Sequence, residues 1–415
     1  MKQVSVCALC VVFCLALTSV SEAKKITKKT KSTNYPATGL YVNGTGNSVD
    51  QSAVMQMVNA SSTSLDIEIY TMEDANFRQA IENALTRGVS VTIIKEPNPV
   101  DDKCAVFSPP TSGEPAYCPL ERQLFSDIQA AGGKVVPFNK TNLCGTATKY
   151  CVEHGKMVIV DKVIAMISTG NFDPTSLCDA SEDPSQCDRD YSVITDDSDV
   201  VGAVNQIFAK DLVGNKYDLS SILTPTVAAK LTVSPLSMQP IVDFIQSAKT
   251  SIMVQNQYLD DPTMNAALVQ AAESGVDVSI MVSSECAFGK PSKSVVADAT
   301  KTFQEFDQAG IQSTLFTGEI KIGGKSGYLH AKTMIVDGTS AWVGSVNGST
   351  EALSTNREFG LFITDQSEIA PLSQVMAADA VDPGAESWQQ SLECSKDKNS
   401  IQPNDLRSLL SLNSI

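Results

Sequence analysis

The sequence has few of the residues that several classes of protein require. Among 415 residues there are two histidines and two tryptophans, and aromatic residues make up only 6%. Two histidines are too few for a histidine-rich metal centre, and no group of cysteines and histidines has the spacing of metal ligands. Glycine and proline are near their average frequencies, which excludes collagen-like and low-complexity chains. We therefore expect a globular protein, bilobal or two-domained, that needs no metal or other cofactor.

Positive charge is also scarce. Lysine and arginine number 31 against 47 aspartates and glutamates, so the net charge is −16. A protein that wraps nucleic acid in a basic surface needs the opposite balance, although a small basic cleft remains compatible with this composition. The exception is the segment 24–35, which begins with five lysines in eight residues. We expect it to be a solvated arm, although such an arm can also attract anionic headgroups.

Long hydrophobic runs are absent except at the N-terminus. Lys2 precedes an almost uncharged run over residues 4–18, and Ser21 and Ala23 place small residues at the positions that define signal cleavage. The run is shorter than the roughly 20 residues of a membrane span. Residues 1–23 are therefore interpreted as a signal peptide, and the protein is expected to be secreted or lumenal, for example endolysosomal.

Cysteine usage agrees with that compartment. Three of the 11 cysteines fall in the signal segment, and the remaining eight are an even number, as disulfide bonding requires. Many pairings are open, but proximity in the sequence favours Cys104–Cys118, Cys144–Cys151, Cys178–Cys187 and Cys286–Cys394. Sequons predict glycosylation at Asn43, Asn59 and Asn139.

An internal repeat predicts the architecture. Residues 153–161 (EHGKMVIVD) recur as 329–337 (LHAKTMIVD), and an apolar run at 64–70 recurs at 251–257. Between these segments each copy reads as helix, strand, helix, strand: 76–86, 89–94, 120–131 and 134–138 in the first, and 264–274, 276–282, 300–309 and 312–316 in the second. This alternation predicts an α/β fold. We expect two lobes related by a pseudo-twofold axis, each a mixed, mostly parallel sheet flanked by helices.

The repeat also sets the expected domain boundaries. The N-terminal lobe covers 36–217 and the C-terminal lobe 241–395, and a tail follows at 396–415. The segment 218–240, rich in proline, serine and threonine, is the expected connector. The repeated motifs are expected to meet at the seam between the lobes, which places the active site there.

Both histidines lie in the repeated motif, which indicates a paired role. Residues i and i+2 of a strand face the same side, so His154 emerges with Lys156, and His330 with Lys332. Hairpin turns are expected to follow, and the return strands end in hydroxyl and amide residues. Together these groups match the size and charge of a phosphate. The predicted phosphate-binding residues are Thr169, Asn171, Ser345 and Asn347.

An arginine and an acid follow each return strand, and the acids are Asp190 and Glu358. A carboxylate here can hold one imidazole nitrogen and fix the tautomer; the alternative is a surface salt bridge with the preceding arginine. The first copy has eight additional residues before Asp190, including Cys178 and Cys187, which predict a stapled loop at the cleft rim. Asn347 lies in a sequon, but its expected burial predicts that it carries no glycan.

The motif His-x-Lys-x4-Asp, followed by Gly-Ser-x-Asn and present twice, resembles that of the phospholipase D superfamily. The second copy matches fully at 344–347, whereas the first has Ser168 and Thr169 in place of glycine and serine. The resemblance covers most of the chain and is to compact secreted and lumenal members. It implies that His154 attacks phosphorus to form a phosphohistidine while His330 protonates the leaving oxygen.

The resemblance further implies that the motif lysines bind phosphate oxygens, and that Asp161 and Asp337, which complete the catalytic motif, have a structural role. It leaves the substrate open. We favour a secreted phospholipase D that acts at a membrane surface on lipids such as phosphatidylcholine, with transfer to primary alcohols, because an acidic protein suits a zwitterionic headgroup better than a polyanion. The alternatives are an exonuclease for single-stranded nucleic acid and an inactive binding relative. A monomer is expected.

Overall fold

The computed structural model describes residues 35–44, 52–99, 104, 106–110, 112–144, 151–289, 291–322 and 324–395. The predicted signal peptide, nearly all of the lysine-rich arm and the tail at 396–415 lie outside these residues. Within them, no helix is both long and apolar enough to cross a membrane.

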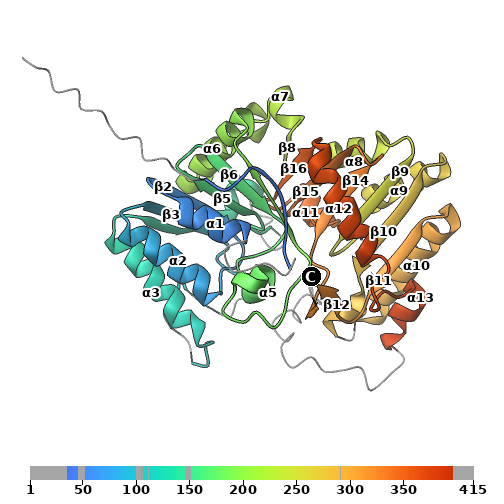
Figure 1. Ribbon diagram of the computed structural model, residues 1–415, viewed down its shortest axis with the longest axis horizontal. Coiled ribbons are helices and arrows are strands. Elements are labelled where there is room, and N and C mark those ends of the chain that lie inside the picture. The colour runs from blue at the N-terminus through green and yellow to red at the C-terminus, as the bar shows by residue number, and fades with distance from the viewer. Residues whose placement is uncertain are drawn as a thin grey trace, which may run out of the picture. The chain divides into compact units, whose positions relative to one another are not determined.

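The N-terminal half forms a seven-stranded sheet in the order β1-β7-β6-β5-β2-β3-β4 (Figure 1). Its strands are β1 (Gly39–Val42), β2 (Ser64–Ile69), β3 (Ser90–Lys95), β4 (Lys134–Pro137), β5 (Lys156–Val160), β6 (Ile164–Ser168) and β7 (Tyr191–Thr195). Its helices are α1 (Ala53–Ala60), α2 (Ala75–Thr86), α3 (Tyr117–Ala130), α4 (Lys140–Cys144), α5 (Pro174–Leu177) and α6 (Ser198–Val213). Apolar side chains of α1, α2 and α3 pack on one face of the sheet, and those of α6 pack on the other.

The C-terminal half repeats this topology in the order β8-β16-β15-β14-β9-β10-β11. Its strands are β8 (Leu231–Val233), β9 (Ser251–Asn256), β10 (Asp277–Ser283), β11 (Gln312–Phe316), β14 (Lys332–Val336), β15 (Ser340–Gly344) and β16 (Phe359–Ile363). A separate hairpin joins β12 (Ile320–Ile322) and β13 (Lys325–Gly327). The helices are α7 (Pro225–Ala228), α8 (Met238–Gln246), α9 (Pro262–Glu273), α10 (Lys293–Ala309), α11 (Thr350–Ser354), α12 (Gln366–Asp379) and α13 (Trp388–Ser391).

The two sheets share one hydrophobic core. A single cluster of buried side chains includes Ile167 and Val193 from the first sheet and Val343 and Leu361 from the second. These residues lie on the return strands and the strands beside them, so the faces behind the repeated motifs pack against each other. Burial of this apolar surface stabilises the seam where the site was predicted.

The predicted α/β fold with two lobes and mixed sheets is confirmed, but the expectation of mostly parallel sheets is wrong. Only β2–β3–β4 and β9–β10–β11 pair in parallel, and the other four pairings of each sheet are antiparallel. The reason is that each motif strand returns through a tight hairpin, which joins antiparallel neighbours.

The segment predicted as a connector, 218–240, contains α7 and β8 and leads into α8. β8 pairs with β16 at the edge of the second sheet, as β1 pairs with β7 in the first. This segment therefore opens the second repeat as well as joining the halves. Its strand has three residues between prolines and serines, which is too short for a recognisable alternating pattern.

Candidate active site at the seam between the two halves

The two histidines lie at corresponding positions, each two residues before the motif strand of its sheet. The backbones of the halves bond to each other beside them: His154 N donates to Arg357 O at 2.9 Å, and Arg189 N donates to Tyr328 O at 2.8 Å. His330 is 8% exposed, and the His154 side chain is 13% exposed. The structure thus brings both imidazoles to the seam.

Each imidazole is held by a carboxylate from the other half. His154 Nδ1 lies 2.9 and 3.0 Å from the two carboxylate oxygens of Glu358, and His330 Nδ1 lies 2.9 Å from Asp190 Oδ1. Glu358 and Asp190 thus lie where they can orient the histidines, as predicted from the sequence. Because the carboxylates occupy Nδ1, Nε2 is the ring nitrogen that can face a substrate; at His154 the backbone of Ser345 also bonds to the ring.

The arginines that precede these acids are buried and do not pair with them. Arg189 binds Asp379 through two contacts of 2.8 Å, and Arg357 binds Asp211 at 2.9 and 3.2 Å. Each arginine–acid dipeptide therefore spans the seam, so neither half has a complete site alone. Sequence analysis missed Asp211 and Asp379; the available signal was the arginine repeated before each acid.

The hydroxyl groups predicted to bind phosphate have other partners. Thr169 Oγ1 donates to Asp190 Oδ1 at 2.6 Å. Ser345 Oγ accepts a hydrogen bond from Phe359 N at 3.0 Å. Its hydroxyl group also bonds to the Glu358 carboxyl and lowers the pKa of that group. Both side chains hold the orienting carboxylates, because the return strand of each half runs beside the strand that follows the acid.

The motif lysines and the two asparagines are the groups left to bind a phosphate. Lys156 Nζ donates to His154 O at 2.6 Å, and Lys332 Nζ donates to His330 O; both side chains are fully buried. Burial lowers the pKa of Lys156 to about 8 and holds that of Lys332 well below its usual value. Among the described residues, the side-chain oxygens of Asn171 and Asn347 have no hydrogen-bond partner although they are buried.

The motif aspartates lie at the far ends of their strands, away from the imidazoles. Asp161 and Asp337 have φ values of 52° and 53° and the residues after them 63° and 63°, as the predicted two-residue hairpins require. Asp161 accepts hydrogen bonds from the backbone of residues 62–64, and Asp337 from that of residues 249–251. They fix the loops before β2 and β9, which agrees with a structural role.

The electrostatic environments of the two imidazoles differ. Burial raises the pKa of the Glu358 carboxyl to about 8, and Lys156 opposes this only in part. Burial also acts to raise the pKa of Asp190, but the charge of His330 and its hydrogen bond hold it below its usual value. Burial, with the motif lysines, lowers the pKa of both imidazoles, that of His154 well below its usual value. The pKa of both imidazoles is therefore lowered, and Asp190 opposes this lowering at His330.

The insertion at 171–190 packs on the second half as a stapled loop. The disulfide Cys178–Cys187 closes it, and Cys187 N donates to Ser326 O at 3.0 Å. Gly327 makes this approach possible, because a Cβ atom there would lie 1.6 Å from the carbonyl oxygen of Cys187. The loop thereby fixes the chain just before Asp190.

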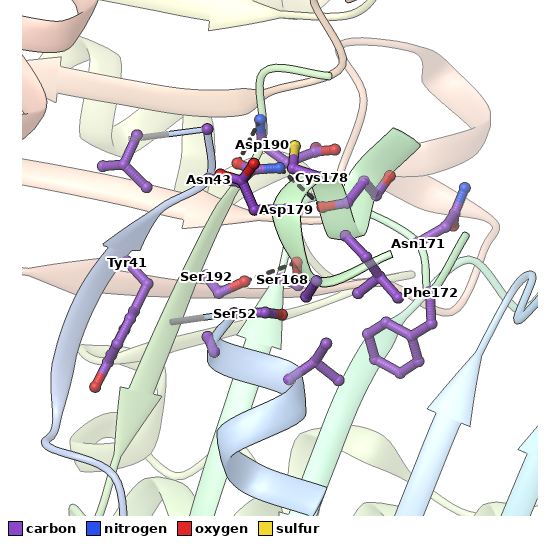
Figure 2. A pocket seen from close by; sticks show the side chains of 17 residues that line it. Tyr41, Asn43, Ser52, Ser168, Asn171, Phe172, Cys178, Asp179, Asp190 and Ser192 are labelled. Carbon is purple, nitrogen blue, oxygen red and sulfur yellow. Dashed lines mark hydrogen bonds between the residues drawn. The ribbon is translucent and has the colours of Figure 1, made fainter. Parts of the chain in front are cut away.

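A cavity of about 50 Å³ lies between β1, the start of α1 and this loop. Figure 2 shows Asn43 and Cys178 near Asp190 at one end of the cavity, and Phe172 beside Asn171. The second carboxylate oxygen of Asp190 is buried and has no partner among the described side chains. The cavity therefore offers room for water next to the carboxylate that holds His330.

The disulfides Cys104–Cys118 and Cys178–Cys187 are confirmed. Cys151 and Cys286 are also disulfide-bonded, whereas the side chains of their predicted partners, Cys144 and Cys394, lie outside the described part of the chain.

Asn43, one of the predicted glycosylation sites, is hydrogen-bonded within the fold, and its glycosylation stays a prediction. Its amide nitrogen donates to Ser176 O at 2.9 Å and to Asp188 O at 3.1 Å, and its oxygen accepts from Asp190 N at 3.0 Å. A glycan on that nitrogen would remove a hydrogen that these bonds need. Asn59 and Asn139 are exposed and remain predictions.

In the described ranges, no group of three or more acids, cysteines and histidines is placed to hold a metal ion.

A family model described as "Cardiolipin synthase, PLD-like domain" matches residues 54–212 and 241–380. The chain belongs to the phospholipase D superfamily. The resemblance predicted from the doubled motif is thus confirmed. The two matched segments correspond to the two halves described above, so this phospholipase D-like chain carries two copies of the domain.

Two bacterial cardiolipin synthases are similar in sequence. That of Listeria welshimeri is 29% identical over 140 residues, which is 33% of this chain and 26% of the relative. That of Halalkalibacterium halodurans is 25% identical over 264 residues, 59% and 49% of the two chains. The alignments thus span half or less of these relatives. Phosphatidylserine synthase of Haemophilus influenzae superposes with a TM-score of 0.55 at 14% identity, over 85% of this chain and 88% of that one, which shows a shared fold.

Proposed function

We propose that this phospholipase D-like protein cleaves the bond between the phosphorus of a phospholipid and the oxygen of its headgroup. It then transfers the phosphatidyl group to water or to a primary alcohol. The observation that carries the proposal is the pair of imidazoles, each held at Nδ1 by a carboxylate of the other half beside two buried lysines. Two such imidazoles at one site can perform a double displacement at phosphorus without a cofactor.

In the first step, His154 Nε2 attacks phosphorus. The bond between phosphorus and the headgroup oxygen breaks, and that oxygen takes the proton of His330. The ammonium groups of Lys156 and Lys332 neutralise charge on the nonbridging oxygens, and the amides of the two asparagines donate to them. The products of this step are the free headgroup alcohol and a phosphohistidine.

In the second step, His330 is neutral and acts as the base. It removes a proton from water or from an alcohol, whose oxygen bonds to phosphorus while the phosphorus–nitrogen bond to His154 breaks. Water yields phosphatidic acid, and a primary alcohol yields a new phosphodiester. Both imidazoles return to their starting forms.

The two environments support this assignment of roles. A nucleophile must be neutral, and the low pKa of His154 beside the raised pKa of Glu358 favours that form. A general acid must carry a proton, and Asp190 favours it on His330 by opposing the burial that lowers the pKa of this imidazole. The surroundings thus support a division of roles in which His330 rather than His154 carries the proton.

A phospholipid substrate is supported by the surroundings of His330. The ring of Tyr328 lies 6.3 Å from that imidazole and packs with Tyr258, and the acidic residues Asp260 and Glu285 lie next to each other nearby. Partial desolvation and the negative charge of Glu285 raise the pKa of Asp260 to about 7. Aromatic and acidic groups suit a cationic headgroup better than a polyanion. The names of the similar bacterial synthases support a phospholipid substrate and transfer to an alcohol.

We further propose that the protein acts as a secreted or lumenal monomer that contacts the membrane surface from one side. The disulfides support an oxidising compartment.

The test is a paired turnover assay at acidic and neutral pH. Phosphatidylcholine vesicles, with and without a primary alcohol, and a single-stranded oligonucleotide are offered to the wild type and to His330→Ala. Choline release and alcohol transfer that are both lost in the variant support the proposal. Oligonucleotide shortening without choline release replaces it with a nuclease, and no turnover of either substrate replaces it with an inactive binding relative.

A further inference from the structure

A buried carboxyl group on β2 has no part in the steps above. Glu68 is fully buried; among the described residues no N–H group or hydroxyl pairs with its oxygens, and the side chains that meet it are the carboxyl groups of Glu153 and Asp211. Its neighbours along the sheet are apolar, Ile94 on β3 and Met157 on β5. The titratable groups that act on it come from the other elements packed there: Glu153 before β5, Asp211 on α6, Tyr217 after α6 and Arg357 before β16.

The nearby arginine offsets only part of the effect of burial on this group. Arg357 is already bound to Asp211, to Ser234 O at 2.8 Å and to the Tyr217 hydroxyl at 2.9 Å. Carboxyl groups that meet in a buried place cannot all ionise, and one of them keeps a proton. Accordingly, burial raises the pKa of both Glu68 and Glu153 well above its usual range, with Asp211 adding to the first shift and Glu68 to the second.

The second half has an amide at the same position. The repeat aligns Glu68 with Gln255, and Asp211 with Asp379. Gln255 Nε2 donates to Asp379 Oδ2 at 2.8 Å, and its oxygen accepts from the Tyr191 hydroxyl at 2.7 Å. Glu68 can donate the corresponding bond to Asp211 only when it is protonated, because an ionised carboxylate is an acceptor alone.

The neighbour of Glu68 is tied to the backbone around His154. Glu153 Oε1 accepts from Gly155 N at 2.7 Å, and Glu153 N donates to Glu96 Oε2 at 2.8 Å. These two bonds flank His154. A shift of the Glu153 side chain would therefore move the segment that presents the imidazole.

We propose that Glu68 is a positioning residue that works as a neutral carboxyl group: it donates its proton in a hydrogen bond to Asp211, accepts a hydrogen bond from the protonated Glu153, and so fixes the segment that carries His154. The inference rests on the proposed role of His154. When the proton leaves at high pH, negative charges meet in a buried space and the 153–155 segment is displaced. Stability from this cluster is present at low pH and is lost as the pH rises.

The test compares Glu68→Gln, which installs the residue of the second half, with Glu68→Ala. The converse variant Gln255→Glu is the matched control. Because the chain has two histidines, their imidazole NMR signals can be assigned by removing either one. The His154 signal and the midpoint of thermal unfolding are followed as the pH is raised from acidic to alkaline, and turnover is measured alongside.

We expect the wild-type midpoint to fall and the His154 signal to shift with rising pH. Glu68→Gln should suppress both changes and keep at least about half of the acidic-pH turnover, whereas Glu68→Ala should lose roughly tenfold or more. Gln255→Glu should add a second fall of the midpoint with pH.

Two results would overturn the inference. One is a Glu68→Gln variant as defective at acidic pH as Glu68→Ala, since the working form would then be the charged carboxylate. The other is a wild-type pH dependence that persists in Glu68→Gln. The NMR and unfolding measurements use no substrate, so an error in the proposed lipid chemistry would be seen separately, in the vesicle assay.

Discussion

The two halves of the molecule repeat one topology, strand for strand, yet they differ in the groups around their imidazoles. The first half has Glu68 and Asp190 where the second has Gln255 and Glu358. Only the first half carries the disulfide-closed insertion. A duplicated backbone can thus place two identical side chains symmetrically while the neighbouring acids shift the pKa of each to a different extent.

The repeat also explains why the site needs both halves. The pairs His154–Glu358 and His330–Asp190 each join one half to the other. The buried arginine–aspartate pairs cross in the same way. A break in either half is therefore expected to disturb the imidazole of the other.

The largest effect is expected from removing either imidazole. His154→Ala and His330→Ala should each lower lipid turnover roughly 10³-fold or more, because one loses the nucleophile and the other the general acid. A phosphatidyl ester of nitrophenol, whose leaving group needs no proton, separates the roles. A burst of nitrophenolate, one equivalent per enzyme, should persist in His330→Ala, which lacks the base for the second step, and should be absent in His154→Ala. An equal burst in both variants would contradict the division of roles between the halves.

A smaller effect is expected from neutralising the orienting acids. Asp190→Asn should lower kcat/KM about 10–100-fold. In the pH–rate profile, the decrease at alkaline pH should move about one unit to lower pH, because the variant lacks the charge that favours protonated His330. Glu358→Gln should cost less and leave that limb in place, since Glu358 holds the nucleophile His154 and not the acid His330. Rate profiles of the two variants over pH test this difference. The same shift in both would show that the halves are electrostatically equivalent.

Opening the insertion should have a moderate effect. Replacing Cys178 and Cys187 with serine should lower the free energy of unfolding by about 2–3 kcal/mol, as expected for a short closed loop, and should also reduce turnover because the loop positions Asp190. The matched control replaces Cys104 and Cys118, which close a loop of similar length. Denaturant unfolding should change similarly in both variants, with turnover reduced only in the first. If the variant without the Cys178–Cys187 disulfide kept full activity, the insertion would have no role in positioning Asp190.

The smallest effect is expected from chelation. Excess EDTA should leave the rate unchanged, because the proposed steps use two imidazoles, two lysines and two amides and no metal ion. The measurement is headgroup release before and after dialysis against the chelator, with readdition of divalent ions. A rate that falls on dialysis and returns with one ion would contradict the cofactor-free mechanism.

The repeat, the α/β class and the core of the site could be predicted from the residues alone. His154 and His330 could be read from the sequence because their spacing from the lysines and the hairpin turns is a local property of a strand and its turn. Two of the disulfides could be predicted for the same reason, since their cysteines are close in the chain.

Only the tertiary structure decided which groups meet across long stretches of chain. Asp190 and Glu358 were predicted from the sequence to bind histidines. The packing of the two sheets decides that Asp190 binds His330 and Glu358 binds His154, so that each acid holds the imidazole of the other half. Thr169, predicted to bind phosphate, instead donates a hydrogen bond to Asp190, because the strands that carry them are neighbours. Asn43 accepts a hydrogen bond from Asp190 N, because β1 lies next to the start of β7. Glu68 shows the physical reason most clearly: burial and the identity of distant neighbours set the charge of a side chain, and neither is encoded in its local sequence.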